Sequence, residues 1–356
     1  MINMKKLVTM MAMASISMMA MAQNELSSGL NKADFDTSVR AADDFYAYAC
    51  GGWMKNNPLP AAYSRYGSFD RLQEENDKRV NGILKELQEN TYEKGTLEQK
   101  LSDLYKLAMD SVRRNQEGVA PLMPLIKRLE TAKTNAQLQA IQLELAPYGE
   151  EEFFFCGFGA DDKNASQNIL NVSQGGLSMG QKEYYLDNDK ATADIREAFK
   201  KHVVKMFQLF GFSKSAATKK MQNVMKVETA LAKVSKSRTE LRDPEANYNK
   251  MTLQEFESKY PNLPLVKVMN AQGVDTKYLQ EMVVGQPAFL EGANALVAGI
   301  KPAEYRDVME WGFISGAANY LSDATVAESF DFNGRVRSGR KENHPLWKRS
   351  TGQVSV

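Results

Sequence analysis

The chain has 356 residues, with 45 lysines and arginines against 44 aspartates and glutamates, so its formal net charge is +1. Proteins that bind nucleic acids usually carry an excess or a stripe of basic residues, and the balanced charge argues against that class. The length allows one large domain or two ordinary ones, and an apolar content of 43% is sufficient for a buried core.

Residues 1–22 are typical of a secretory signal peptide. Two lysines precede an apolar run over residues 7–22, which ends in a small-x-small pattern before Gln23. The run is shorter than the roughly 20 residues of a membrane-spanning helix. We therefore expect an exported protein, periplasmic or extracellular, that leaves the membrane once the signal is cleaved. Residues 23–42 are polar and lack periodicity, which predicts a flexible leader.

Most of the remaining chain has the apolar periodicity of α-helices. Asp43 or Asp44 is placed to cap a short aromatic helix that follows it. Thr96, Thr134 and Thr252 each stand three residues before a Gln or Glu, which is the pattern of a capping box. We expect further helices, each with one apolar face for packing in a bundle, over residues 69–90, 97–108, 122–129, 134–145, 195–210, 213–231 and 302–320.

Two short apolar runs interrupt the helical pattern. Residues 153–158 and 169–172 lie on either side of a polar segment, which predicts a β-hairpin near residues 153–173. We expect this hairpin to be the one strand-like part of the chain. The predicted fold class is therefore mainly α, a multi-helix lobe with one small β-hairpin.

Residues 43–72 combine aromatic side chains, paired glycines and two prolines. Gly51 and Gly52 allow two backbones to approach closely or the chain to turn sharply, while Pro58 and Pro60 keep the chain extended. This stretch resembles the neprilysin and endothelin-converting-enzyme family of zinc metallopeptidases. The resemblance rests on Asp44-Phe45-Tyr46, residues 48–53, Pro60, residues 64–67, Phe69-Asp70, Arg242-Asp243, Tyr248-Asn249, Met251 and residues 330–349.

The resemblance covers only the N-terminal, non-catalytic half of that family. It implies that residues 43–349 form the helical lobe that faces a zinc-bearing lobe across an enclosed chamber, which admits peptides and excludes folded proteins. Residues 350–356 then form a truncated tail. We expect the substrate-enclosing lobe of an exported zinc metalloendopeptidase whose catalytic lobe is missing from this chain. The alternatives are a standalone, non-enzymatic helical module that binds peptides or a partner, and a truncated regulator that pairs with a full-length relative.

Catalysis in the resembled family needs a His-Glu-x-x-His helix, in which the two histidines bind zinc and the glutamate acts as general base. This chain has only His202 and His344, far apart in the sequence. We expect a packed or surface side chain at His202 and a loop residue at His344. The sequence also lacks a Gly-x-Ser-x-Gly elbow, a phosphate loop and a Cys-x-x-Cys pair. We therefore expect no catalytic residue, no metal ligand and no activity in this chain alone, with zinc a cofactor of the full-length enzyme.

Arg65 is the one residue that the resemblance marks as a site. The matching arginine of the family lines the primed side of the cleft and helps to hold the C-terminal carboxylate of a peptide, which suits a planar guanidinium. The alternative is a salt bridge at the surface or between domains. Some relatives carry a second arginine eight residues further on, where this chain has Gln73, so we expect weaker recognition of that carboxylate.

The chain has two cysteines, Cys50 and Cys156. An exported protein can form a disulfide bond between them, and two buried thiols are the alternative. In secreted animal relatives, the cysteine that matches Cys50 is bonded to the catalytic half.

Overall fold

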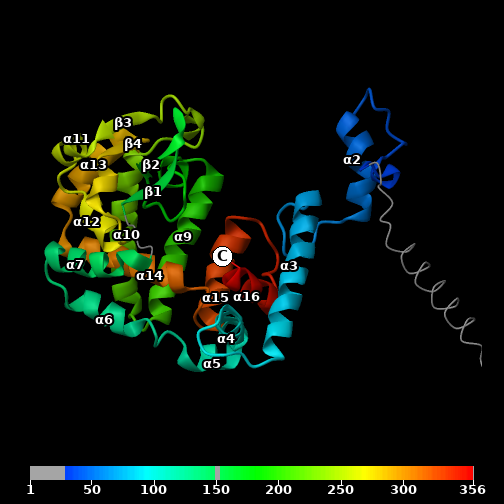
Figure 1. Cartoon of the computed structure of the whole chain (residues 1–356), viewed down its shortest axis with the longest axis horizontal. Coiled ribbons are helices and arrows are strands. Elements are labelled where there is room, and N and C mark those ends of the chain that lie inside the picture. Colours follow the sequence, from blue (N-terminus) through cyan, green and yellow to red (C-terminus); the bar gives the residue numbers. More distant parts are fainter. Residues whose placement is uncertain (1–28, 149–152, 356) are drawn as a thin grey trace, which may run out of the picture. The chain divides into compact units, whose positions relative to one another are not determined.

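The computed structural model describes residues 29–148 and 153–355 and divides the chain into two units, residues 1–60 and 61–356 (Figure 1). The expected signal peptide lies outside the described residues. Within them, fifteen α-helices and four short strands confirm the mainly α fold class. None of the described helices is both long enough and apolar enough to cross a membrane.

The first unit contains α2 (Phe45–Asn56) and a short 3-10 helix, η1 (Lys32–Asp34). Asp44 caps α2 by accepting a hydrogen bond from the Ala47 amide at 2.9 Å, as predicted. A Cβ atom at Gly52 would lie 2.2 Å from the Ala33 carbonyl oxygen, so glycine permits the close approach of two backbones that the sequence indicated. Of the leader expected over residues 23–42, the structure describes residues 29–42, where the Asp36 amide donates to the Tyr48 carbonyl of α2 at 2.7 Å.

The second unit begins at Ala61 and holds the other fourteen α-helices. They are α3 (Ser68–Gln88), α4 (Leu97–Met109), α5 (Ser111–Glu117), α6 (Met123–Thr131), α7 (Asn135–Leu145), α8 (Glu183–Leu186), α9 (Lys190–Leu209), α10 (Lys214–Val234), α11 (Leu253–Lys259), α12 (Leu265–Ala271), α13 (Pro287–Gly299), α14 (Pro302–Ala317), α15 (Asp323–Phe330) and α16 (Leu346–Val354). A π-helical turn, η5 (Asp331–Val336), follows α15.

The sheet of the second unit has four strands in the order β1-β2-β4-β3. The predicted hairpin is present as β1 (Phe154–Asp161) and β2 (Asn164–Gln174), which pair antiparallel. The expectation that it would be the one strand-like part is wrong. β4 (Glu281–Val284) pairs parallel with β2, and β3 (Asn249–Thr252) pairs antiparallel with β4. Both added strands have only four residues, too few to show a period of two.

The core of the second unit lies around α10, which contacts α9, α13 and α14 (Figure 1). The helix expected over residues 195–210 buries one apolar face, which consists of Phe199, Val203, Met206 and Phe207 on α9 and of Phe210 directly after it. α10 likewise buries one apolar face, which includes Val224, Val227 and Leu231. Because apolar residues recur at helical spacing on these elements, their packing could be predicted from the sequence.

The helices α3 and α4 differ from the expected pattern. The helix expected over residues 69–90 was predicted to bury one apolar face, but on α3 Phe69, Leu72 and Ile83 are 85%, 61% and 58% exposed. The buried side chains of α3 are Leu84 and Asn81, so its packed face combines an apolar and a polar residue. There Asn81 donates hydrogen bonds to the Tyr105 hydroxyl at 2.6 Å and to the Thr351 hydroxyl at 3.0 Å.

The end of the chain also differs from the expected tail. Residues 350–354 belong to α16, where Ser350 and Thr351 are buried. Their hydroxyl groups contact α3 and α4 rather than solvent: Ser350 donates to the Ala108 carbonyl at 3.1 Å, and Thr351 accepts from Asn81. The segment expected as a tail is therefore part of the packed unit.

Candidate functional site

Arg65 lies on an exposed segment that enters α3, and its flanking residues are fixed on both sides. The Ala61 carbonyl accepts hydrogen bonds from the amides of Lys341 and Glu342 at 2.9 and 3.1 Å. Gly67 is the N-cap of α3, and its amide donates to the Asp70 carboxylate at 2.8 Å. Arg65 itself is exposed and makes no hydrogen bond or ion pair with another described residue. Its guanidinium is therefore available to a ligand.

Two tyrosines hold the segment against α3. The hydroxyls of Tyr63 and Tyr66 donate to the two carboxylate oxygens of Glu74 at 2.9 and 2.8 Å. Lys348 donates to the Tyr63 hydroxyl at 2.5 Å and lies 3.3 Å from Asp77. Burial, followed by the bond to Glu74, raises the pKa of Tyr66 to about 12, so this phenol stays a donor at neutral pH.

Gln73 occupies the position at which some relatives carry a second arginine. Its side chain is uncharged and cannot form an ion pair with a carboxylate. Gln73 is exposed on α3 and donates a hydrogen bond to Asp77 at 2.7 Å. Arg65 therefore lacks the second arginine that some relatives carry eight residues further on. Its role in substrate binding stays a prediction at this point.

The two histidines lie in environments of different kinds. His202 is buried on α9, with Nδ1 3.0 Å from the Glu328 carboxylate and its ring stacked on Phe332 at a centroid distance of 5.0 Å. It is a packed core side chain, as predicted. His344 lies in the loop before α16, where its ring contacts that of Tyr63, and burial lowers its pKa.

The residues described here do not form the zinc site of the resembled family. The one group of at least three carboxylate, histidine or cysteine side chains close enough to share an ion within the described ranges is Glu130, Asp307 and Glu310. This group contains no histidine, and the ammonium of Lys220 already lies among its oxygens at 2.6–2.9 Å. Its donor set therefore does not fit zinc, and no catalytic step is assigned to it.

A further buried carboxylate, Glu228, was not identified from the sequence. It accepts hydrogen bonds from the Ser178 hydroxyl at 2.6 Å, the Ser178 amide at 3.3 Å and the Tyr185 hydroxyl. The Trp311 indole donates to the Ser178 hydroxyl at 2.8 Å. Burial raises the pKa of Glu228 to about 7, although its donors lower it. Its position on the buried face of α10, three residues before Leu231, was the available signal.

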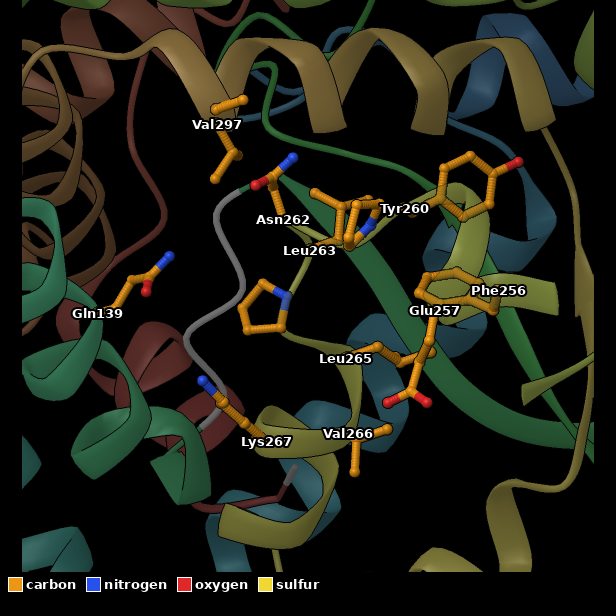
Figure 2. A pocket seen from close by; sticks show the side chains of 13 residues that line it. Gln139, Phe256, Glu257, Tyr260, Asn262, Leu263, Leu265, Val266, Lys267 and Val297 are labelled. Atoms are coloured by element: carbon orange, nitrogen blue, oxygen red, sulfur yellow. The ribbon is translucent and has the colours of Figure 1, made fainter. Parts of the chain in front are cut away.

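A pocket of about 420 Å³ lies where α7, α11, α12 and α13 meet. Figure 2 shows Gln139 and Lys267 on one side of it and Phe256 and Glu257 on the other. The lining also includes Leu263 and other apolar residues. No nucleophile and general base stand together among its described lining residues, so we assign it no chemistry.

The structure thus defines a mainly helical protein in which Arg65 is exposed at the start of α3. The family model described as "Peptidase family M13" matches residues 41–356. The chain belongs to this family. The expected resemblance to neprilysin and endothelin-converting enzymes is confirmed, as is its restriction to the N-terminal half.

Individual relatives agree with the family match. The chain is 29% identical over 327 residues to human endothelin-converting enzyme 1 and 26% identical over 355 residues to mouse neprilysin, covering 89% and 90% of this chain. The solved structure of the zinc metalloprotease Zmp1 of Mycobacterium tuberculosis with an inhibitor superposes with a TM-score of 0.85 over 92% of this chain, at 25% identity. The chain spans about half the length of these relatives, namely 42%, 46% and 50%.

Proposed function

We propose that this chain is the N-terminal, substrate-enclosing half of an exported zinc metalloendopeptidase that degrades peptides. The observation that carries the proposal is the family match over residues 41–356, combined with coverage of only about half of each relative. The zinc ion and the groups that activate water belong, in this proposal, to a catalytic half beyond these residues. The described residues contribute binding and enclosure of the peptide.

Exposed apolar side chains support the presence of a second half. On α3, Phe69 and Leu72 stand at successive turns and are 85% and 61% exposed. On α2, Phe45 and Tyr46 are 69% and 68% exposed. Such side chains favour an interaction surface, since soluble monomers rarely leave large apolar patches uncovered. A standalone binding module would be expected to cover them, so the proposal of a half is preferred.

The proposal predicts that the chain alone is inactive. Metal analysis of the purified chain should find no stoichiometric zinc, and a quenched-fluorescence peptide should remain uncut. The coding sequence beyond Val356 should contain a His-Glu-x-x-His segment in frame. Stoichiometric zinc and chelator-sensitive cleavage by these 356 residues would contradict the proposal that the catalytic groups lie in another half. A stop codon with no such segment would favour the standalone module.

Export can be tested by N-terminal sequencing of the protein recovered from the producing cells. Cleavage of the expected signal peptide should leave Gln23 as the first residue of the mature chain. Recovery of an intact Met1 from a cytoplasmic fraction would contradict export without affecting the family assignment.

Arg65 is proposed to bind the C-terminal carboxylate of a peptide. Because a hydrogen bond to a charged group contributes about 1.5–3 kcal/mol, Arg65→Ala should weaken binding of a peptide with a free C-terminal carboxylate about tenfold or more. The same peptide with an amidated C-terminus should bind wild type and variant equally. Fluorescence anisotropy with labelled peptides measures both affinities.

The control for this experiment is Arg71→Ala, an exposed arginine on α3 that faces Glu75 at 4.0 Å. This variant should leave both affinities unchanged. Arg65→Lys should keep part of the effect, because an ammonium retains the charge but loses the planar pair of donors. Equal losses for the acid and the amide peptide in Arg65→Ala would rule out carboxylate recognition by this residue.

A further inference from the structure

Three helices meet at a buried cluster of five charged side chains. Glu130 comes from α6, Lys220 from α10, and Arg306, Asp307 and Glu310 from α14. Lys220 lies 2.6 Å from Glu130, 2.9 Å from Asp307 and 2.6 Å from Glu310. Since side chains of Lys and Glu are rarely buried unless paired, a cluster of this kind needs its charges to balance.

Both cations of the cluster are side chains of this chain, Lys220 and Arg306. Lys220 fills the position between the three carboxylates, and Arg306 approaches Glu130 and Asp307 at 3.4 Å from the side. The Phe212 ring covers the ammonium at a centroid distance of 4.6 Å. The cluster therefore holds its own cation and needs no metal ion.

The balance of charge leaves one carboxylate in excess, because three carboxylates face two cations. Glu310 is the most deeply buried of the three, with 0% of its side chain exposed, compared with 3% for Asp307 and 41% for Glu130. Its Oε1 atom is buried without a hydrogen-bond donor. A protonated Glu310 would remove the excess charge and turn this group into a donor.

The pKa values of the two glutamates are displaced in opposite directions. Desolvation raises the pKa of Glu310 to about 8, and the Glu130 carboxyl, which has an oxygen within 4.8 Å of one of Glu310, acts in the same direction, although Lys220 lowers it. Desolvation also raises the pKa of Glu130, but the hydrogen bond from Lys220 and the neighbouring Glu310 carboxyl outweigh it, and the net pKa is lowered. Opposite displacements are typical of two carboxyl groups that share one proton.

We propose that Glu310 holds a proton shared with Glu130, and that loss of this proton in alkaline solution releases α6 from α10 and α14. Both carboxylates would then be negative at close range and repel each other. Glu130 is the one that can move into water, because it is the most exposed of the three. Asp307 and Glu310 would keep Lys220 between them.

The groups around Glu310 are consistent with a single titration. The charged groups that face it are Glu130 from α6, Lys220 from α10, and Arg306 and Asp307 from its own helix. The neighbouring amide is Asn223 of α10, which donates to Asp307 at 2.6 Å and does not titrate. α9 and the turn after it contribute the Phe207 and Phe212 rings.

Infrared spectroscopy tests the proton directly. A protonated carboxyl group has a carbonyl stretch that an ionised one lacks, so the difference spectrum between wild type and Glu310→Gln should contain this band well below the pKa of about 8 and lose it well above. The control is Glu144→Gln. Glu144 is an exposed residue of α7 that pairs with Arg128 of α6, so its replacement should leave the band intact. A difference spectrum without the band at low pH would overturn the proposal.

Amide hydrogen exchange tests the release of α6. Wild type and Glu310→Gln should protect α6 equally in mild acid, and wild type alone should lose this protection in alkaline solution. Equal protection in both proteins at alkaline pH would overturn the release. Should Glu310→Gln fail to fold, Glu130→Gln gives a second test. It removes one negative charge, so Glu310 should ionise at lower pH and the band should vanish near neutral pH; an unchanged band would overturn the shared proton.

Discussion

At the scale of single residues, Glu228 links three donors in a part of the core that contains no cation in hydrogen-bond contact with it. Its bonds to Ser178 and Tyr185 fix the segment that precedes α9. The same segment is held from the other side by Arg337, which donates to the Ser178 and Met179 carbonyls at 3.4 and 3.2 Å.

Glu228→Ala is expected to destabilise the protein strongly. Each buried donor left without an acceptor costs about 1–3 kcal/mol, so the loss in free energy of unfolding should reach about 3 kcal/mol or more. Glu228→Gln keeps an acceptor oxygen and should lose less. Urea denaturation measures both values. The control Glu86→Ala, at an exposed site on α3, should change the free energy by no more than about 0.5 kcal/mol.

Gly334 gives a second prediction at this scale, in the π-helical turn after α15. A Cβ atom there would lie 2.2 Å from the ring of Phe330, so Gly334→Ala should cost about 1–3 kcal/mol by overpacking. Gly312 on α14 has no neighbouring atom within 4 Å of such a Cβ. Gly312→Ala should therefore stabilise the helix by up to about 1 kcal/mol. Melting temperatures that fall equally for both variants would contradict the packing argument.

At the scale of elements, the capping boxes decide where several helices begin. Thr134 accepts from the Gln137 amide, and the Gln137 side chain accepts from the Thr134 amide, at 3.3 and 3.2 Å. The same reciprocal pair is present at Thr252 and Glu255. These signals are local in the sequence, which is why both helix starts could be predicted to within a residue.

Thr134→Ala is expected to lower the free energy of unfolding by about 1 kcal/mol, the usual contribution of an N-cap. The matched control is Thr131→Ala on the preceding helix, where the hydroxyl bonds only to a carbonyl of its own last turn. That variant should lie within about 0.5 kcal/mol of wild type. Guanidinium denaturation of the two variants distinguishes the cap from a general effect of losing a threonine.

The elements that could not be predicted depend on distant partners. β4 pairs with β2, more than one hundred residues earlier in the chain, and no local pattern announces that pairing. The apolar face of α3 could be predicted from the sequence. Whether that face is buried depends on which other segment packs against it, and the local sequence does not specify that segment. The charged cluster had one signal: Lys220 lies three residues after Ala217 and four before Val224, on the buried face of α10.

At the scale of the whole molecule, stability should depend on pH through its buried acids. Glu228 and Glu310 have pKa values raised by burial to about 7 and about 8, above the value of 4.5 for an unperturbed glutamate. Folding therefore takes up protons, and the stabilisation from these groups is fully present below pH 4.5 and lost as pH rises through the folded pKa values. Glu130 and Glu328 have lowered pKa values, so the stabilisation that they contribute is lost as the pH falls through those values.

The melting temperature is thus expected to be highest in mild acid and to fall between about pH 5 and pH 8. In the Glu228→Gln and Glu310→Gln double variant this decline should be much smaller, because neither amide titrates. Differential scanning calorimetry across the pH range measures both curves. A wild-type curve that rises toward pH 8 would contradict the raised pKa values.

The site could be predicted only as far as residue type and position allow. Arg65 was identified through the resemblance of its surrounding motif, and the structure adds that it is exposed between two anchored tyrosines. The tyrosine contacts could not be foreseen, because Glu74 and Lys348 come from segments that meet only in the folded unit.

The polar contact between α3 and α16 has a consequence for the order in which the chain can fold during synthesis. Asn81 and Thr351 are 270 positions apart, and a ribosome adds roughly 5–20 residues per second, so the wait is on the order of tens of seconds. Throughout that time α3 and α4 have no α16 to bind, and their facing amides and hydroxyls remain hydrated. A nascent chain arrested before residue 346 should therefore exchange the amides of α3 and α4 rapidly, because the last helix of this unit is the one that secures its first helix.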